Sequence, residues 1–307
     1  MTAAAAGRLV GVDVGGTKCL GIALDGSGAS LGELRIETPD DADQLIATIA
    51  RIAIDLGAEG RVGIGVPGLV NNDGVLLAAP NVTGVRNLAL RDLVSAATGL
   101  DVRVDNDNTL ACLAEWKLGA GRGSRDLLLV GIGTGIGGGF VSGGAIQRGA
   151  HGFAAEFGHM IVERDGIACP CGQHGCWERY ASGTGLATIA RAAAAAGELS
   201  FSNGLEELRG EDVTEAARTG DAEALAVIDT FADWIALGLA NLTNLYDPDT
   251  IVLAGGISAD PDIFLPRILT AMSRRLWGTS LRTHPALRFA ELGPSAGAIG
   301  AAFLTLD

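Results

Sequence analysis

Three cysteines and one histidine in the middle of the chain have the residue types and the spacing of metal ligands. His159 is followed by Cys169, Cys171 and Cys176. Three thiolates and one imidazole complete the tetrahedral shell of a structural Zn²⁺ ion, with no open position for a substrate. His174 competes with His159 for the fourth position on spacing alone, and reduced, unligated thiols are the alternative. The cluster therefore predicts a loop whose order depends on Zn²⁺.

Two glutamates flank this cluster. Glu156 stands three residues before His159, and Glu178 stands two residues after Cys176. A metal loop that fixes both would place two carboxylates in one region, where they could accept hydrogen bonds from sugar hydroxyls. The plainer interpretation is that each glutamate lies alone on a solvated surface.

A run of four Asx residues, Asp105-Asn106-Asp107-Asn108, stands between a predicted strand and a predicted helix. Helix capping explains part of the run, and Asn108 suits that role. Four such residues exceed what one cap needs. A kinase that acts on an alcohol needs a carboxylate to accept the hydroxyl proton and to orient the oxygen toward the γ-phosphate. Asp107 suits this task, with Asn106 holding the substrate.

The first of three glycine turns has the composition of a phosphate-binding loop. Gly15 and Gly16 follow a strand directly, and their backbone N–H groups could converge on an anion. Thr17 and Lys18 add donors, and Asp13 at the strand end could position hydrated Mg²⁺. The order of residues is not that of a Walker A loop, and no helix follows. A plain turn in a surface hairpin is the alternative.

The second turn, 133–139, contains the pattern G-x-G-x-x-G, but a strand follows it where a dinucleotide-binding fingerprint requires a helix. We therefore expect Gly133, Thr134 and Gly135 to form a second phosphate-binding hairpin. Gly255-Gly256 is a third glycine pair at a strand end. Three such turns suit a nucleotide held in a cleft between two domains, as in phosphoryl transferases.

Short hydrophobic runs and turn residues predict the elements that position these groups. Strands are expected at 8–14, 19–24, 62–66, 101–105 and 250–254, and helices at 41–57, 109–118, 185–196, 221–245 and 297–304. The triplet Val10-Gly11-Val12 recurs as Val130-Gly131-Ile132, and a glycine-rich turn follows each. This similarity suggests two like hairpins, each opening one domain. The last helix is rich in small residues, so we expect it to pack closely on its neighbour.

The composition suits an acidic globular chain. Of the 307 residues 48% are hydrophobic, and the formal net charge of −14 disfavours a surface that binds nucleic acid nonspecifically. The longest uncharged stretch, 127–147, contains eight glycines and is not expected to span a membrane. The first residues lack the pattern of a signal peptide, and five cysteines are an odd number, so we expect a cytoplasmic protein without disulfides. Cys19 and Cys112 are expected to be buried core thiols.

Taken together, these motifs resemble the ROK family of sugar kinases and repressors. The pattern Glu156-x-x-His159 and the cysteine run with Glu178 are highly specific, and the resemblance extends to 13–18, Pro67-Gly68, Asn106-Asp107, 133–139, 251–256 and 297–302. It implies an α/β protein with the actin-like, duplicated ATPase (ribonuclease H-like) fold and a cleft between two domains. We expect a small α/β domain formed by 1–110 and 294–307, and a large α/β domain, with the zinc-binding loop, formed by 111–293.

The resemblance also implies an ATP-dependent hexokinase-type reaction, most often on O6 of glucose, with Mg²⁺ on the phosphates and a structural Zn²⁺. By the family pattern Asp107 is the general base, and His159 rather than His174 ligates the zinc. The residues expected to hold the sugar are Gly68, Asn106, Asp107, Glu156, His159 and Glu178. The residues expected to bind ATP are Asp13, Gly15, Gly16, Thr17, Lys18, Gly133, Thr134 and Gly135, with Gly255 and Gly256 at the adenosine.

The same residues also suit other functions. A kinase for N-acetylated hexosamine, mannose or fructose, or one that uses polyphosphate, would carry the same groups. A sugar-sensing transcription regulator needs a helix-turn-helix before the first strand, which already begins near Leu9. The departures from the family pattern are Asn108-Thr109-Leu110 in place of Ala-Asn-Ala, Ala155 in place of Gly, and Trp177 in place of an aliphatic residue. The family resemblance suggests a homodimer or homotetramer.

Overall fold

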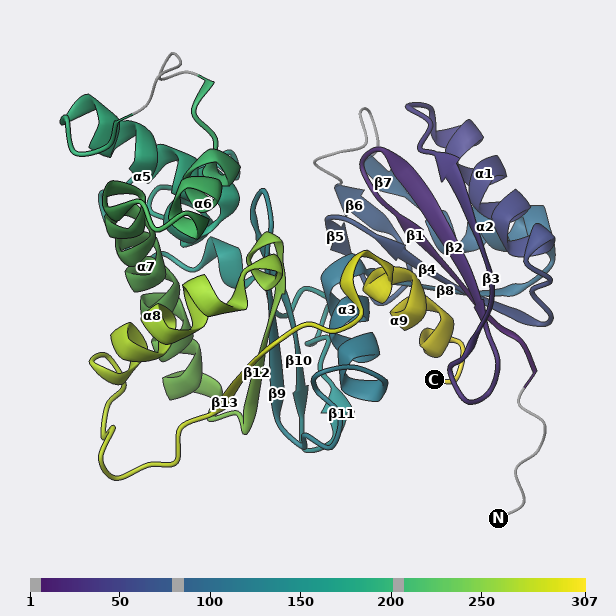
Figure 1. The fold of residues 1–307 in the computed structure, drawn as a ribbon. Coiled ribbons are helices and arrows are strands. Elements are labelled where there is room, and N and C mark those ends of the chain that lie inside the picture. Colours follow the sequence, from purple (N-terminus) through teal and green to yellow (C-terminus); the bar gives the residue numbers. More distant parts are fainter. Residues whose placement is uncertain (1–6, 79–85, 201–206) are drawn as a thin grey trace. The chain divides into compact units, whose positions relative to one another are not determined.

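The computed structural model describes residues 7–78, 86–200 and 207–307, which divide into two compact units (Figure 1). Unit 1 comprises Met1–Ser124, Gly139–Ala155 and Glu291–Asp307, and unit 2 comprises Arg125–Gly138 and Glu156–Ala290. Compared with the domains expected from the sequence, unit 1 also takes in 111–124, 139–155 and 291–293. The functional domain boundaries at 110/111 and 293/294 stay a prediction.

The two large sheets have the same strand order. The first has the order β3-β2-β1-β4-β8 and the second β11-β10-β9-β12-β13. In each, the outer hairpin is antiparallel and the last two strands are parallel to their neighbours. The strands are β1 (Leu9–Val14), β2 (Lys18–Leu24), β3 (Ser30–Glu37), β4 (Arg61–Val66) and β8 (Asp101–Asn106), and then β9 (Leu127–Ile132), β10 (Ile136–Ser142), β11 (Ala145–Ile146), β12 (Thr250–Gly255) and β13 (Ala286–Phe289). The repeat suggested by the sequence is therefore a repeat of whole sheets.

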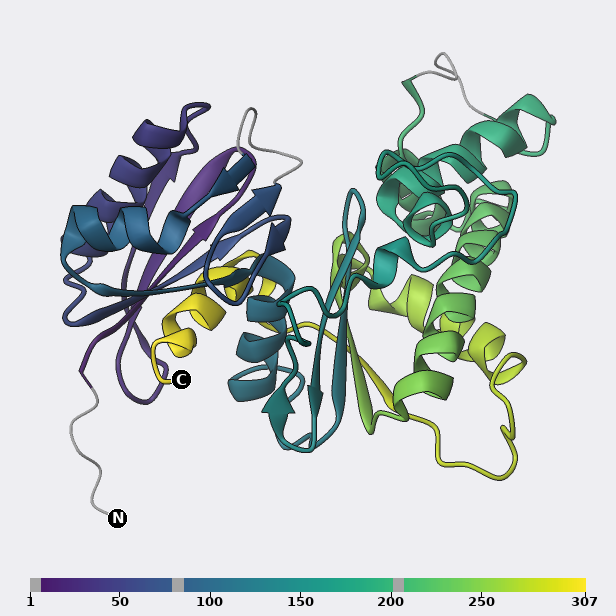
Figure 2. The same cartoon turned by 180° about the vertical axis from the view of Figure 1, so that it is seen from behind.

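Helices cover both faces of the first sheet (Figures 1 and 2). On one face β1 and β4 pack against α1 (Ala42–Asp55) and α2 (Leu90–Thr98), and on the other face β1 and β2 pack against α3 (Asp107–Lys117) and α9 (Ala296–Leu304). The alternation of strand side chains assigns Val10 and Val12 to the first face. Three short strands, β5 (Leu69–Val70), β6 (Leu76–Ala78) and β7 (Arg86–Leu88), form a further sheet.

The small-residue helix α9 packs on the sheet as closely as expected. A Cβ atom added at Gly11 would lie 2.2 Å from the carbonyl oxygen of Ala298, and one added at Gly63 would lie 1.8 Å from that of Ala301. Glycine in these two strands therefore lets the backbone of the helix approach the backbone of the sheet. Cys19 and Cys112 are both buried in the core of this unit, which confirms their prediction as core residues.

In addition to its strands, unit 2 consists largely of helices. Its helices are α4 (Glu178–Ala181), α5 (Gly183–Ala195), α6 (Gly210–Arg218), α7 (Ala222–Tyr246) and α8 (Pro261–Ser273), with the short turns η1 (Phe157–His159) and η3 (Gly256–Ala259). Among the described residues α7 is the one helix long and apolar enough to cross a membrane by length and composition alone. It packs against α4, α5, α6 and α8, and 56% of its most apolar window is buried, as in the core helix of a globular protein.

Candidate active site and cysteine cluster

Asn106 joins β8 to α3 and fixes the start of the helix. Its side-chain oxygen accepts hydrogen bonds from the backbone N–H groups of Asn108 (2.9 Å) and Thr109 (3.1 Å), and its amide nitrogen donates to the carbonyl oxygen of Gly68 (3.1 Å). The expectation that Asn108 caps the helix was wrong. Asn106 is the cap because its oxygen satisfies two N–H groups of the first turn, so the helix begins at Asp107.

Asp107 is therefore the first residue of α3, and it lies half-buried. Its Oδ1 accepts hydrogen bonds from the backbone N–H (2.9 Å) and the side-chain amide (3.0 Å) of Asn108. Withdrawal from water raises the pKa of Asp107 above the ordinary carboxyl value, and the bonds from Asn108 oppose this rise. A held carboxylate with a raised pKa is a stronger proton acceptor than a solvated one, which is what a general base requires.

Asp13 lies near the end of β1, and its carboxylate is buried. Its Oδ1 is buried and has no hydrogen-bond partner among the described residues. Burial, and secondarily the charge of Asp107, raise the pKa of Asp13 to about 7. Gly297 of α9 leaves room for this carboxylate, since a Cβ atom there would lie 2.7 Å from its Cγ. An unpartnered buried oxygen fits a hydrated Mg²⁺, whose ligands are oxygens and whose charge would favour the ionised form.

The turn between β1 and β2 is tight and braced from one side. The N–H of Gly15 donates to the carbonyl oxygen of Lys18 (2.9 Å), and Thr38 binds both the carbonyl oxygen of Gly15 (2.7 Å) and that of Thr17 (3.1 Å). Gly16, Thr17 and Lys18 are exposed, so their donors are accessible to an anion. Thr38 lies 23 residues from Gly15 in the chain, and nothing in the sequence singles it out as a brace.

Unit 2 contains a cavity of about 790 Å³, in the size range of small-molecule sites. Gly133, Thr134 and Gly256 are on its wall. A Cβ atom added at Gly133 or Gly256 would meet nothing within 4 Å, so both glycines present bare backbone to open space. The structure thus brings together the second and third predicted glycine turns.

Two further predicted glycines are packed against the protein and are absent from that wall. A Cβ atom at Gly135 would lie 2.6 Å from Oε2 of Glu178. Gly255 has a φ of +87°, and a Cβ atom there would lie 2.1 Å from the carbonyl oxygen of Ile132. Both positions require glycine for local reasons, and their contact with ATP stays a prediction.

The start of α5 holds the second glycine turn. The N–H of Gly183 donates to the carbonyl oxygen of Gly133 (2.8 Å), and the Thr184 hydroxyl donates to that of Thr134 (2.8 Å). The cavity also has charged and apolar walls that sequence reasoning missed, because they come from segments without a motif. They include Arg191, Arg209, Glu211, Asp212, Arg218, Ile257 and Asp260.

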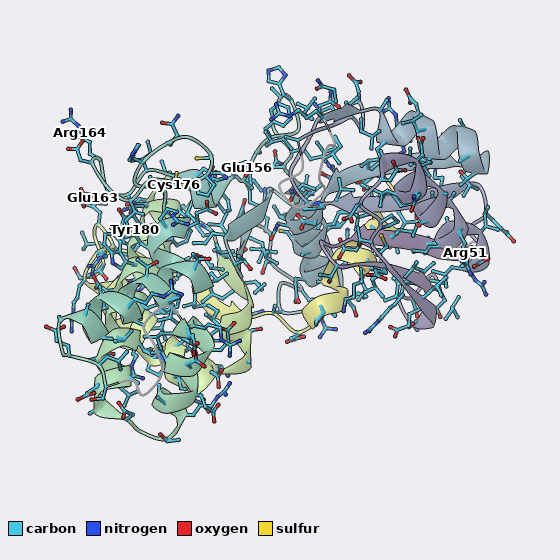
Figure 3. The ribbon with its side chains drawn as sticks, turned by 90° about the horizontal axis from the view of Figure 1, so that it is seen from above. Arg51, Glu156, Glu163, Arg164, Cys176 and Tyr180 are labelled. Atoms are coloured by element: carbon cyan, nitrogen blue, oxygen red, sulfur yellow. The ribbon has the colours of Figure 1, made fainter. Side chains whose placement is uncertain are left out.

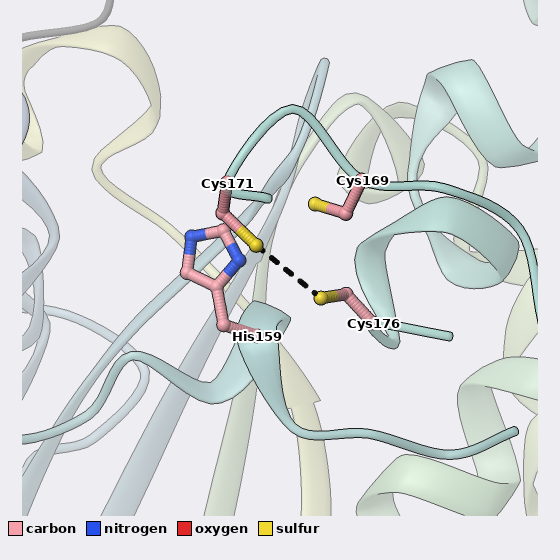
Figure 4. Close-up of side chains that lie close together, drawn as sticks. All are labelled: His159, Cys169, Cys171 and Cys176. Carbon is pink, nitrogen blue, oxygen red and sulfur yellow. Dashed lines mark hydrogen bonds between the residues drawn. The ribbon is translucent and has the colours of Figure 1, made fainter. Parts of the chain in front are cut away.

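The four predicted metal ligands converge in unit 2 (Figure 4). One ligand atom from each of His159, Cys169, Cys171 and Cys176 lies within 4.8 Å of the others. The Sγ atoms of Cys171 and Cys176 are 3.6 Å apart, close to the separation of about 3.8 Å between ligands of a tetrahedral ion with Zn–S bonds of about 2.3 Å. The donor set therefore fits Zn²⁺. His174 does not belong to this group.

The two predicted glutamates lie at the edge of the cluster. Oε1 of Glu178 lies 3.8 Å from Nδ1 of His159 and 3.1 Å from Sγ of Cys169, and Oε2 of Glu156 lies 4.0 Å from Nε2 of His159. A metal-bound imidazole can donate its other N–H to such a carboxylate, which fixes the ring. The two carboxylates thus lie beside one imidazole, as their positions around the cluster predicted.

Tyr180 ties the cysteine loop to α4. Its hydroxyl oxygen accepts a hydrogen bond from the N–H of Ile167 (2.8 Å), and its ring stacks on Trp234. Figure 3 labels Tyr180 together with Glu156, Glu163 and Cys176 in this unit. These contacts connect the loop to α4 and α7, and no motif predicted them.

The repeated sheets, the strand-end carboxylates and the glycine turns define an actin-like ATPase of the α/β class. The chain belongs to the ROK family, whose sequence profile it matches over residues 9–307. The resemblance drawn from the motifs is thereby confirmed.

Individual relatives agree with this membership. The chain is 36% identical to the glucokinase of Streptomyces coelicolor, with 98% of each chain covered, and 32% identical to the N-acetyl-D-glucosamine kinase of Shigella boydii, with 96% of this chain and 98% of that one covered. Its structure is similar to that of a ROK family glucokinase from Streptomyces griseus in complex with glucose and AMPPNP, with a TM-score of 0.84 and 37% identity over 98% and 99% of the two chains. These relatives confirm the expected enzyme class, a sugar kinase.

Proposed function

We propose that this protein is an ATP-dependent glucokinase that transfers the γ-phosphoryl group to O6 of glucose. The observation that carries the proposal is the half-buried carboxylate of Asp107, which Asn108 holds at the start of α3. The pKa of this carboxyl is raised. The similarity to glucokinases over nearly the whole chain supports glucose as the acceptor.

In this mechanism Asp107 accepts the proton of the O6 hydroxyl while the oxygen attacks phosphorus. Phosphoryl transfer passes through a loose transition state, so positioning and charge neutralisation carry most of the catalysis. We assign the holding of the sugar to Gly68, Asn106, Glu156, His159 and Glu178. The side-chain oxygen of Asn106 already caps α3. Its amide nitrogen, which donates to the carbonyl oxygen of Gly68, is therefore the group that can turn to a sugar hydroxyl.

We assign the phosphates to the two glycine turns. Gly15, Gly16, Thr17 and Lys18 offer N–H, hydroxyl and ammonium donors from the first turn, and Gly133, Thr134 and Gly135 offer donors from the second. Asp13 would hold a hydrated Mg²⁺, and the ion would supply positive charge to offset that of the phosphates. Gly255 and Gly256 are assigned to the adenosine, and the cavity beside Gly256 is large enough for it.

We assign a structural Zn²⁺ to His159 and the three cysteines. Its chemistry is to cross-link the loop and thereby to hold Glu156, His159 and Glu178 in place. We further propose that the protein is cytoplasmic and forms a homodimer or homotetramer, as the family resemblance suggests.

The main alternative is a different acceptor or donor. The similarity to an N-acetyl-D-glucosamine kinase supports an N-acetylhexosamine as the runner-up, ahead of mannose and fructose. Polyphosphate in place of ATP is a further alternative, as is a sugar-responsive transcription regulator of the same family.

The deciding experiment measures kcat/KM side by side on glucose, mannose, fructose, N-acetylglucosamine and N-acetylmannosamine, with ATP and with polyphosphate. Glucose with ATP should give the highest value. A higher value for another sugar or for polyphosphate would contradict the assignment and name the correct pair. Specific DNA binding in a gel-shift assay, without turnover of any sugar, would favour the regulator.

A further inference from the structure

Asp105, two residues before the predicted general base, forms a buried ion pair with Arg148 that the mechanism above does not use. Asp105 has only 6% of its surface exposed, and its Oδ2 lies 2.6 Å from Nε of Arg148. The same guanidinium binds Asp307 at 3.0 Å through a second nitrogen. Asp307 is half exposed, so the two pairs differ in their surroundings. Arg148 lies 43 residues from Asp105, in the loop after β11.

A chain of hydrogen bonds connects this ion pair to the predicted catalytic residues. Oδ1 of Asp105 accepts the N–H of Asn106 (2.9 Å), so the arginine and the backbone hold opposite oxygens of one carboxylate. Asn106 in turn caps α3, and Asp107 is the first residue of that helix. A rotation of Asp105 would therefore shift the peptide that carries Asn106 and Asp107.

The loop of Arg148 also braces the segment that carries Gly68. The Asn72 side-chain amide donates to the carbonyl oxygen of Ala150 (2.9 Å), and a Cβ atom at Gly152 would lie 2.5 Å from the carbonyl oxygen of Val70. Asn106 binds the carbonyl oxygen of Gly68 from the other side. The loop of Arg148 thus contacts both segments of unit 1 to which we assign sugar binding.

We propose that Arg148 is a positioning residue for phosphoryl transfer, which acts through Asp105 to hold Asn106 and Asp107 in their productive places. This proposal rests on the proposed function. A buried carboxylate that loses its cationic partner must take up a proton or turn toward water. Burial already raises the pKa of Asp105, and Arg148 opposes that rise. Either response changes the acceptor for the N–H of Asn106.

The test compares Arg148→Met, Arg148→Lys, Asp105→Asn and the double variant Arg148→Met/Asp105→Asn with the control Asp307→Asn. Arg148→Met should lower kcat on the order of 10- to 100-fold, because small displacements of reacting groups cost this much. The sugar KM should change less than kcat. Arg148→Lys should recover part of the loss. The control removes the exposed pair on the same guanidinium and should keep kcat within about twofold, because exposed pairs contribute little.

The double variant separates positioning from simple loss of a side chain. It contains no unpaired buried charge at this pair, and the amide oxygen that Asp105→Asn introduces can still accept the N–H of Asn106. Its kcat should therefore exceed that of Arg148→Met alone. Equal losses of kcat in Arg148→Met and in the double variant would overturn the proposal. Wild-type kcat in Arg148→Met, or a loss in Asp307→Asn as large as in Arg148→Met, would do the same.

Hydrogen exchange gives a readout that does not depend on the substrate. The N–H groups of Asn108 and Thr109 are held by Asn106 and should exchange faster in Arg148→Met than in wild type, and more slowly again in the double variant. All rates are measured on the sugar that the wild-type enzyme turns over fastest. An error in the glucose assignment therefore appears in the wild type and leaves this comparison intact. If Arg148→Met does not fold, the lysine and double variants carry the test.

Discussion

Asp13 and Asp107 lie on either side of Gly65 at one edge of the first sheet. A Cβ atom at Gly65 would be 3.1 Å from Oδ1 of Asp13 and 3.9 Å from Cα of Asp107. The charge of Asp107 helps to raise the pKa of Asp13 to about 7. The two carboxylates are thus electrostatically coupled, and their proposed tasks differ: one accepts a proton and the other holds a hydrated cation.

The first prediction concerns pH and stability. The pKa of Asp13 is about 7 in the folded protein and 3.8 as its ordinary value. Between these values the unfolded state binds fewer protons than the folded state, so this group makes the free energy of unfolding fall as pH rises from about 4 to about 7. Asp13→Asn should reduce that fall. Urea unfolding without Mg²⁺ at several pH values measures it.

The control for this measurement is Asp92→Asn, which replaces an exposed carboxylate on α2. Its pH dependence should match that of the wild type. If Asp13→Asn also follows the wild-type curve, Asp13 has no raised pKa.

The second prediction concerns the general base. Asp107→Asn keeps an oxygen that can accept the bonds from Asn108 but removes the proton acceptor. The variant should bind sugar almost as the wild type does, with kcat lowered by about 10²- to 10⁴-fold. Steady-state kinetics and sugar titration by tryptophan fluorescence separate the two effects. Asp101→Asn, on the exposed start of β8, is the matched control. Wild-type turnover in Asp107→Asn would remove this residue from the mechanism.

The third prediction concerns the metal. Cys171→Ser should release about one equivalent of zinc and weaken sugar binding, because a tetrahedral site loses one of four ligands and the loop beside Glu178 loosens. Elemental analysis and sugar titration measure both. Cys19→Ala removes a buried thiol outside the cluster and should retain the metal. Purified wild-type protein without zinc would contradict the assignment.

The fourth prediction concerns the second glycine turn. Thr184→Val removes the hydroxyl that donates to the carbonyl oxygen of Thr134. A hydrogen bond of this kind contributes about 0.5–1.5 kcal/mol, so the Kd for a nucleotide analogue should rise about 2- to 12-fold. Thr184→Ser keeps the hydroxyl and should bind the analogue as the wild type does. Equal affinities in all three proteins would show that this bond does not support nucleotide binding.

The fifth prediction concerns Ala155, which has a φ of +73°. L-residues are strained in this left-handed region, whereas glycine is not. The positive φ of residue 155 explains why glycine suits this position in the family pattern. Ala155→Gly should raise the free energy of unfolding by up to about 1 kcal/mol. Denaturant unfolding checks this. A loss of stability would mean that the gain in chain entropy of the unfolded state exceeds the relief of strain.

Elements bounded by clear turn residues could be predicted from the sequence to within one or two residues. The helix expected at 41–57 is α1, and that expected at 221–245 is α7, because each has regular apolar spacing and an Asp cap. Helix α3 begins two residues earlier than expected, since any of four Asx residues could have capped it. Local sequence does not distinguish among equivalent caps.

The candidate site was predictable where a motif marks it. The three cysteines converge as their spacing indicated, and His159 joins them as the family resemblance implied. The ion pair of Asp105 and Arg148 and the hydroxyl of Thr184 were not predictable, because they depend on which segments the fold brings together. A single arginine or threonine in a loop has no sequence signal of its own.

The repeated sheet order has a consequence for how the two halves have diverged. Aligning Val10 with Val130 places Asp13 opposite Gly133, so one copy of the hairpin has an acid where the other has bare backbone. The residue types at this position thus differ between the two hairpins: a carboxylate suits a cation, and bare backbone N–H groups suit an anion. Under the proposed function, Gly133→Asp would make the two hairpins alike at this position and would set a negative charge against the phosphates, so only the asymmetric pair suits a nucleotide with its cation.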